Sequence, residues 1–213
     1  MTRHTFTVGL DIGKQNDYTA AIVLRNTPTA DKTQHDAVHI ERWRGVDYPE
    51  TVRRIQRLIE TIKNPTRLPT PPHVELVVDE GGPGGPVVDM FRDVGLRPIG
   101  VMIHGGHATV RDGMTYRVPK RELVAHVQVC LQSGRFKIAP SLKHADTLVA
   151  ELLAFRVEIS SSGHDRYGND VGATMWREQP HDDLVLAAAM ALWRAESGPR
   201  PNKPEVLRQV VSW

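Results

Sequence analysis

The sequence predicts an α/β fold in which helices flank a mixed five-stranded sheet. Three short segments rich in Val, Ile or Thr open the chain and are separated by turn residues, as in an antiparallel meander. They are residues 5–10, 18–25 and 37–44. Further on, strand 74–78, helix 87–94 and strand 96–103 form one unit, which is typical of a right-handed parallel crossover. We therefore expect a sheet that begins antiparallel and continues parallel.

Four further segments have apolar residues at helical spacing. They are residues 48–62, 120–132, 145–155 and 183–193. The last of them is apolar nearly all round, so we expect it to be buried in the core. Residues 136–138 are predicted to be a short extended segment. Residues 160–172 are rich in Ser, Gly and Asp and predict a loop. A tail with three prolines begins at Ser197, and we expect it to lie outside the core.

Length and composition favour one sizeable domain, residues 1–196, followed by the tail 197–213. The chain has 213 residues, of which 40% are hydrophobic, and no apolar run approaches the roughly 20 residues that cross a bilayer. Cys130 is the single cysteine, so an internal disulfide is excluded, and the first residues show no apolar signal region. We expect a soluble protein of a reducing cytoplasm, with no membrane partner.

Charge is balanced overall but unevenly distributed. The 27 Lys and Arg residues nearly cancel the 25 Asp and Glu residues, which excludes a bulk polycation. Between Arg111 and Lys143, however, seven basic residues face only two acidic ones. A local basic surface is therefore expected.

Acidic residues stand where predicted strands end or a helix begins. Asp11 follows the first strand, Asp79 follows strand 74–78, and Asp182 and Asp183 open the last helix. If these elements are neighbours, the carboxylates converge at one edge of the sheet and need a cation to neutralise them. Their hard oxygen atoms suit two Mg²⁺ or Mn²⁺ ions, which together cleave a phosphodiester without a protein nucleophile.

Each acid also has a purely structural interpretation. Asp11 and Asp79 both precede glycines and suit the turn at the end of a strand. Asp182 suits an N-cap, and Asp183 suits the first turn of a helix. The combined order of strand acid, strand acid and helix-start acid favours the metal site.

Four motifs resemble the RNase H-like (RuvC-type) nuclease domain of phage terminase large subunits, the DNA-packaging motor. They are GLDIGKQNDYTAAIVL, VVDEGGPGGPVVDMF, VPKRELVAHVQVCLQSGRFKIAP and HDDLVLAAAMALW. The last motif is the most specific, and the resemblance covers residues 5–195. It implies that Asp11 bridges both metal ions, Asp79 binds one and Asp183 the other. Asp182 is then a neighbouring ligand or a cap.

The resemblance is incomplete in one respect. The family's motor also has an ATPase with a phosphate-binding loop of the form GxxxxGK[ST], and no such string occurs in this chain. We therefore expect either a nuclease domain cut from, or encoded apart from, its motor, with a separate packaging ATPase, portal or small terminase subunit as partner, or else a degenerate remnant. If the protein is encoded by a phage or prophage, its location is the cytoplasm of the host cell.

The basic segment provides candidate contacts to the phosphates of double-stranded DNA. The candidates are Arg111, Arg117, Lys120, Arg121, Arg135 and Lys137. A solvated helix face is the structural alternative for each of them. His104 and His107 have no spaced partner typical of a zinc site, so we interpret them as part of a structural loop.

The predicted function is metal-dependent endonuclease cleavage of double-stranded DNA. A RuvC-like Holliday-junction resolvase has the same fold and order of acids and remains an alternative. A non-catalytic DNA-binding or assembly module is a second alternative, which the intact acids disfavour. An actin- or sugar-kinase-like ATP-binding protein normally needs two such domains, for which 213 residues are too few.

Overall fold

The computed structural model describes residues 4–14, 17–64, 71–159, 165–168 and 182–198. The strands are β1 (Thr5–Asp11), β2 (Thr19–Pro28), β3 (Thr33–Trp43), β4 (His73–Asp79), β5 (Ile99–His104), β6 (Val110–Asp112), β7 (Thr115–Pro119), β8 (Phe136–Ile138), β9 (Arg156–Ile159) and β10 (Asp165–Gly168). The helices are α1 (Tyr48–Lys63), α2 (Gly84–Asp93), α3 (Lys120–Gln132), α4 (Ala145–Ala154) and α5 (Asp183–Ser197).

The main sheet is mixed, as predicted, but it has eight strands in the order β6-β7-β5-β4-β1-β2-β3-β8. The prediction of five strands is wrong because three further short strands lie at the two edges. Of these, the segment 136–138 is predicted from the sequence to be extended, and it joins the sheet as β8. β6 and β8 have three residues each and β7 has five, too few to show a clear alternation of apolar and polar residues.

The order of strand directions agrees with the prediction. β1, β2 and β3 form an antiparallel meander, whereas β1, β4, β5 and β7 run parallel to one another. β1 therefore joins the two halves, with β2 on one side and β4 on the other. This central position makes the end of β1 the natural place for residues from both halves to meet.

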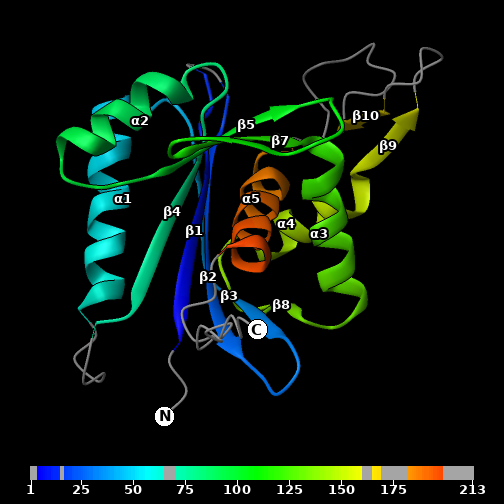
Figure 1. The fold of residues 1–213 in the computed structure, drawn as a ribbon. Coiled ribbons are helices and arrows are strands. Elements are labelled where there is room, and N and C mark those ends of the chain that lie inside the picture. The colour runs from blue at the N-terminus through cyan, green and yellow to red at the C-terminus, as the bar shows by residue number, and fades with distance from the viewer. Residues whose placement is uncertain (1–3, 15–16, 65–70, 160–164, 169–181, 199–213) are drawn as a thin grey trace, which may run out of the picture.

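Helices cover both faces of the sheet (Figure 1). α1 and α2 lie on one face, and α3, α4 and α5 lie on the other. Each face has its own apolar core. Phe91 and Ile55 belong to the first core, and Trp193 and Leu123 belong to the second. α5, which the sequence predicts to be buried, has ten buried residues and lies between the sheet and α3 (Figure 1).

Gly9 sets the distance between β1 and α5. A Cβ atom on Gly9 would lie 2.0 Å from the carbonyl oxygen of Ala187 and 3.0 Å from Cβ of Ala191. Backbone therefore packs directly on backbone here, which glycine alone allows. The close contact places the start of α5 beside the end of β1.

One predicted loop is partly wrong. Residues 165–168, within the predicted loop 160–172, form β10, which pairs with β9 in a separate antiparallel ribbon. The rest of that predicted loop, and the tail beyond residue 198, lie outside the described residues. No helix in the described ranges is both long and apolar enough to cross a membrane.

Candidate metal centre

Asp11 and Asp79 end two neighbouring parallel strands at the same edge of the sheet. β1 and β4 are paired up to the residue before each acid. Side chains alternate along a strand, so Asp11 shares the face of Gly9, which lies against α5. Asp79 shares the face of Val77, which belongs to the core beneath α5. Both carboxylates therefore lie on the side of the sheet that α5 covers.

The start of α5 brings two more acids to this edge. Asp183 is the first residue of the helix, and Asp182 has the N-cap position but makes no capping hydrogen bond through its side chain. Oε2 of Glu151 on α4 accepts hydrogen bonds from the backbone amides of Leu184 at 2.9 Å and Val185 at 3.3 Å instead. The capping role that the sequence suggested for Asp182 therefore belongs to Glu151.

These acids form one electrostatic unit around Asp11. Asp11 is only 9% exposed, and burial raises the pKa of its carboxyl well above the usual range. The negative charges of Asp79, Asp183, Asp182 and Glu151 raise that pKa further. We call these five residues the acid cluster.

Asp79 is stabilised by two neighbours. Burial raises the pKa of its carboxyl, while the amide of Gly81, which donates to Oδ1 at 2.8 Å, and the charge of Lys120 lower it. Lys120 Nζ also lies 3.6 Å from Oδ2 of Asp182. Lys120, predicted from the sequence to contact DNA, is thus positioned at the rim of the acid cluster.

A second cation, Arg42 at the end of β3, lies inside the acid cluster. One of its terminal nitrogens is 3.0 Å from Oδ2 of Asp183, and the other is 3.7 Å from Oε1 of Glu151. Its guanidinium lies 3.8 Å from the ring centre of Tyr18, a cation–π contact. The Arg42 side chain is 12% exposed, so its charge is only weakly screened by water.

Glu151 is the most buried member of the acid cluster, at 2% exposed. Burial, helped by the charge of Asp183, raises the pKa of its carboxyl to about 7. Arg42 and the two amides at the start of α5 oppose that shift. Glu151 is consequently poised between its neutral and charged forms near neutral pH.

The acid cluster fits divalent metal binding by its chemistry. It offers carboxylate oxygens alone, the ligands that Mg²⁺ and Mn²⁺ prefer. Burial raises the pKa of both Asp11 and Asp79, and for Asp11 the neighbouring acids raise it further, so the charged forms of these carboxylates are disfavoured unless a cation is close. Arg42 and Lys120 supply two positive charges against five acids, so a divalent ion would relieve the remaining repulsion.

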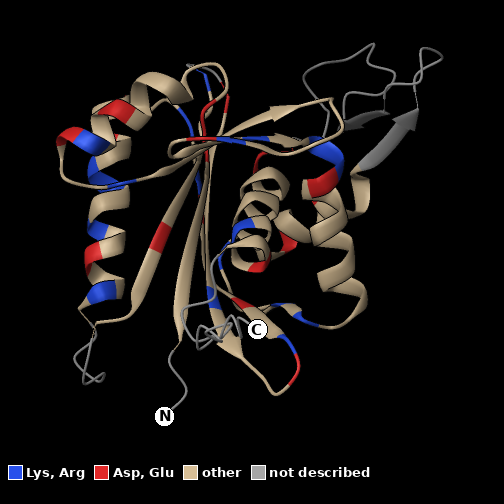
Figure 2. Ribbon diagram, viewed as in Figure 1, with Lys and Arg blue, Asp and Glu red and all other residues tan. Residues whose placement is uncertain are grey.

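The predicted DNA-contacting residues separate into two groups. Arg111 and Arg117 are exposed on the β6–β7 hairpin, and Arg121 is exposed at the start of α3, close to Lys120 (Figure 2). Arg135 and Lys137 are near β8, at the other edge of the sheet.

This second group is also remote from the acid cluster along the strands. Lys137 pairs with Asp36 on β3, six residues before Arg42. At about 3.3 Å per residue this separation is about 20 Å. Arg135 is moreover engaged by Glu196, whose Oε1 lies 2.7 Å from a terminal nitrogen of Arg135.

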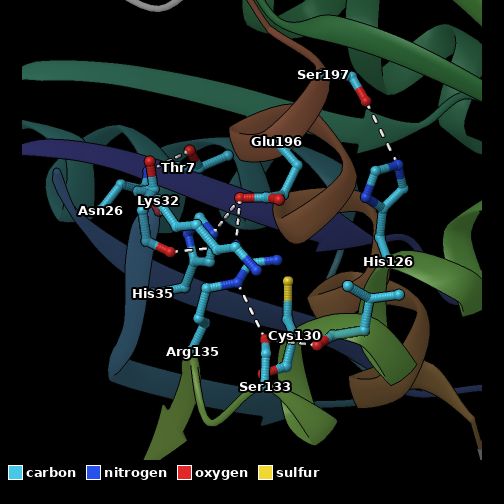
Figure 3. A network of polar contacts seen from close by, with 12 residues as sticks. Thr7, Asn26, Lys32, His35, His126, Cys130, Ser133, Arg135, Glu196 and Ser197 are labelled. Carbon is cyan, nitrogen blue, oxygen red and sulfur yellow. Dashed lines mark hydrogen bonds and ion pairs between the residues drawn. The ribbon is translucent and has the colours of Figure 1, made fainter. Parts of the chain in front are cut away.

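A second polar network ties the far end of α5 to the sheet (Figure 3). His35 on β3 contacts Oδ1 of Asn26 through Nδ1 and Oε1 of Glu196 through Nε2, both at 2.8 Å. Potential ligand atoms of His35, Cys130 and Glu196 lie within 4.8 Å of one another, the one such group among the described residues. Arg135 already supplies the positive charge there, so we interpret this network as structural.

His104 also has a structural role. Its Nδ1 accepts a hydrogen bond from the amide of Gly106 at 2.9 Å, which shapes the turn after β5. His104 is the last residue of β5, so the interpretation of it as part of a loop is wrong, whereas His107 does lie in the loop between β5 and β6.

Sequence reasoning missed Arg42 and Glu151, although a signal for each exists. Arg42 lies two residues after the buried Ile40 and so continues the face that points to α5. Glu151 lies three residues after the buried Leu148, on the buried face of α4. A charged residue on an otherwise apolar face indicates a buried partner of opposite charge.

The sequence model of the terminase RNase H-like domain matches residues 8–195. The chain belongs to this family. The match spans nearly all the described elements, from β1 to α5. The acid cluster therefore lies at the sheet edge of a terminase RNase H-like domain. No curated protein sequence matches the chain.

Solved structures of terminases share the fold of this terminase RNase H-like domain. The large terminase nuclease from thermophilic phage G20c has 20% identity and a TM-score of 0.59, with 88% of this chain and 81% of that chain covered. The Mn-bound nuclease domain of the large terminase from bacteriophage SPP1 has 11% identity and a TM-score of 0.53, with 89% and 86% covered.

A longer terminase shows how much of such a protein this chain represents. The large terminase from another thermophilic bacteriophage has 12% identity and a TM-score of 0.57. The match covers 87% of this chain but only 38% of that longer terminase. At these identities the comparisons establish the fold.

Proposed function

We propose that this domain is a metal-dependent endonuclease that hydrolyses phosphodiester bonds of double-stranded DNA during viral genome packaging. The observation that supports the proposal is that the charges of Asp79, Asp182 and Asp183 all act on Asp11, at one edge of an RNase H-like sheet. A site made of carboxylates alone, with its acids short of positive charge, suits two Mg²⁺ or Mn²⁺ ions. Membership of the terminase family supports the same conclusion.

Each acid of the proposed site has a distinct role. Asp11, the most central, would hold both ions, with Asp79 on one side and Asp183 on the other. Asp182, beside Lys120, is proposed as a further ligand. In such sites the bound ions activate a water molecule and stabilise the leaving oxygen. Glu151 holds the amides at the start of α5 and thereby fixes where Asp183 stands.

The proposed DNA contact begins at the rim of the acid cluster. Arg111 on the β6–β7 hairpin shares the sheet face of Tyr116, the face that α5 covers, and Lys120 and Arg121 lie at the start of α3, so these three are the proposed phosphate contacts. Arg117 pairs with Met102 and lies on the opposite face of the sheet, so it is a weaker candidate. Arg135 and Lys137 can contact the same duplex only if it extends for about 20 Å along the sheet, a length of about six base pairs.

The domain would act with partners that supply ATP-driven motion. We propose a separate packaging ATPase, a portal and a small terminase subunit as these partners. The matched region is 38% of the longer phage terminase, which leaves room for such functions in the rest of that protein.

A plasmid cleavage assay tests the proposal. Purified protein is incubated with supercoiled plasmid and Mn²⁺ or Mg²⁺, and Asp11→Asn is compared with wild type. Asp89→Asn, which changes an exposed acid on α2, is the matched control. We expect metal-dependent nicking and linearisation by wild type and by the control, and at least about a hundredfold loss in Asp11→Asn.

Three results would contradict the proposal. Cleavage that survives in Asp11→Asn would exclude the acid cluster, and cleavage in the presence of excess chelator would exclude the metal. A marked preference for four-way junctions over linear duplex, together with a dimeric protein, would favour the resolvase function instead.

A further inference from the structure

Arg42 is the described cation most deeply placed in the acid cluster. It reaches the cluster from β3, whereas the acids come from β1, β4, α4 and α5. Its guanidinium is held against Tyr18 on one side, at 3.8 Å, and pairs with Asp183 at 3.0 Å. Asp183 is one of the acids proposed above to bind metal. Arg42 and a divalent ion would therefore use the same carboxylate.

The structure also contains a second acceptor for Arg42. Oε1 of Glu151 is buried without a hydrogen bond, 3.7 Å from a terminal nitrogen of Arg42. Nε of Arg42 is likewise buried without a hydrogen-bond partner. A small movement of the guanidinium, of roughly 1 Å, would bring the 3.7 Å contact within hydrogen-bond distance. Buried polar groups tend to be satisfied, so such a movement is favoured whenever Asp183 is occupied by another cation.

We propose that Arg42 is the resident counter-ion of the acid cluster, a positioning residue that pairs with Asp183 without metal and shifts to Glu151 when a divalent ion binds. This inference rests on the proposed metal site, and it adds a competition that sets the metal affinity. Arg42 fixes the position of the Asp183 carboxylate, but its positive charge disfavours binding of a divalent cation there. Removal of that charge should consequently tighten metal binding rather than weaken it.

The direction of this effect distinguishes competition from a merely structural role. A residue that only supports the site lowers metal affinity when it is removed. A like charge within a few ångströms of the ion raises the apparent affinity when it is removed, by roughly tenfold or more in a partly buried site. Loss of the charge also leaves the acids less neutralised, so the metal-free variant should be less stable than the metal-free wild type.

Calorimetric titration with MnCl₂ in the absence of DNA tests the proposal. The variants are Arg42→Gln and Arg42→Met, which both remove the charge, and Arg42→Lys, which keeps it. Arg44→Gln is the matched control, because Arg44 is exposed, two residues along the same chain, and 5.2 Å from the same Tyr18 ring. Urea unfolding of each protein with and without Mn²⁺ shows that the variants fold and reports their stability.

We expect Arg42→Gln and Arg42→Met to bind Mn²⁺ at least about tenfold more tightly than wild type, and Arg42→Lys and Arg44→Gln to stay within about threefold of it. The stabilisation by Mn²⁺ should be larger in the neutral variants than in wild type. Unchanged or weaker binding by both neutral variants would overturn the inference while leaving the metal site intact. Absence of Mn²⁺ binding by wild type would overturn the proposed function and this inference with it.

Discussion

Replacement of Gly9 by alanine should separate α5 from β1 and disturb the acid cluster from a distance. The new Cβ atom would stand 2.0 Å from the carbonyl oxygen of Ala187. A normal contact is about 3.5 Å, so helix and strand must move apart by about 1.5 Å. A backbone oxygen cannot rotate away as a side chain can, and the strain therefore spreads along the helix.

The expected cost follows from overpacking of a dense core. Insertion of one methyl group into such a site lowers the free energy of unfolding by about 1–3 kcal/mol. Because the contact is with backbone, we expect Gly9→Ala to lower it by about 3 kcal/mol. With a urea dependence of about 3 kcal/mol per M for a domain of this size, the unfolding midpoint should fall by about 1 M. Because α5 carries Asp183, Mn²⁺ affinity should fall as well.

Urea unfolding followed by circular dichroism measures this cost, with Gly105→Ala as the control. A Cβ on Gly105 meets nothing within 4 Å, so that variant should stay within about 0.5 kcal/mol of wild type. Adding Ala191→Gly to Gly9→Ala removes the 3.0 Å contact but leaves the 2.0 Å contact with Ala187. A midpoint for Gly9→Ala equal to wild type, or full rescue by Ala191→Gly, would show that the contact with the Ala187 carbonyl does not limit the approach of α5 to β1.

Three further predictions concern the cap of α5, the network at its other end and the DNA contact. Glu151→Ala removes the acceptor for two backbone amides at the start of α5 and should lower the free energy of unfolding, measured with urea, by about 1–2 kcal/mol. Glu151→Gln keeps an acceptor and should lower it less. Burial lowers the pKa of His35 below 6.5, so the unfolded state binds more protons at this residue, and the free energy of unfolding should fall as the pH drops below about 6.5. Unfolding measured at a series of pH values should show a weaker fall for His35→Gln. An equal fall in both proteins would mean that His35 is not the group responsible. Arg111→Gln should lower the salt dependence of duplex binding by about 0.9 in log–log slope, measured by fluorescence anisotropy, whereas Lys63→Gln on α1 should leave that slope unchanged. Equal slopes for both variants would exclude Arg111 from the interface.

The sequence predicted the parts of the fold that have strong periodicity. The meander of β1 to β3, the β4–α2–β5 crossover and the buried α5 all have enough residues to display their pattern. The edge strand β6 does not, because three residues contain too little alternation to separate a strand from a loop, and for β8 the extended segment could be predicted but not its place in the sheet. Their pairing depends on β7 and β3, which is tertiary information.

The candidate site was predictable to the extent that its residues stand at the ends of elements. Asp11, Asp79, Asp182 and Asp183 follow or open strongly patterned segments, so their convergence needed only the strand order. Arg42 sits near the end of a strand whose partners are set by long-range pairing. Glu151 lies in the middle of a helix, and its role appears only when α4 is placed against the start of α5.

The metal site can be located by diffraction from a crystal soaked in Mn²⁺, collected at a wavelength where manganese scatters anomalously. We expect anomalous peaks at the sheet edge among Asp11, Asp79, Asp182 and Asp183, and loss of these peaks in Asp11→Asn. Peaks confined to the His35, Cys130 and Glu196 group, or no peak in the acid cluster at saturating Mn²⁺, would contradict the proposed metal site.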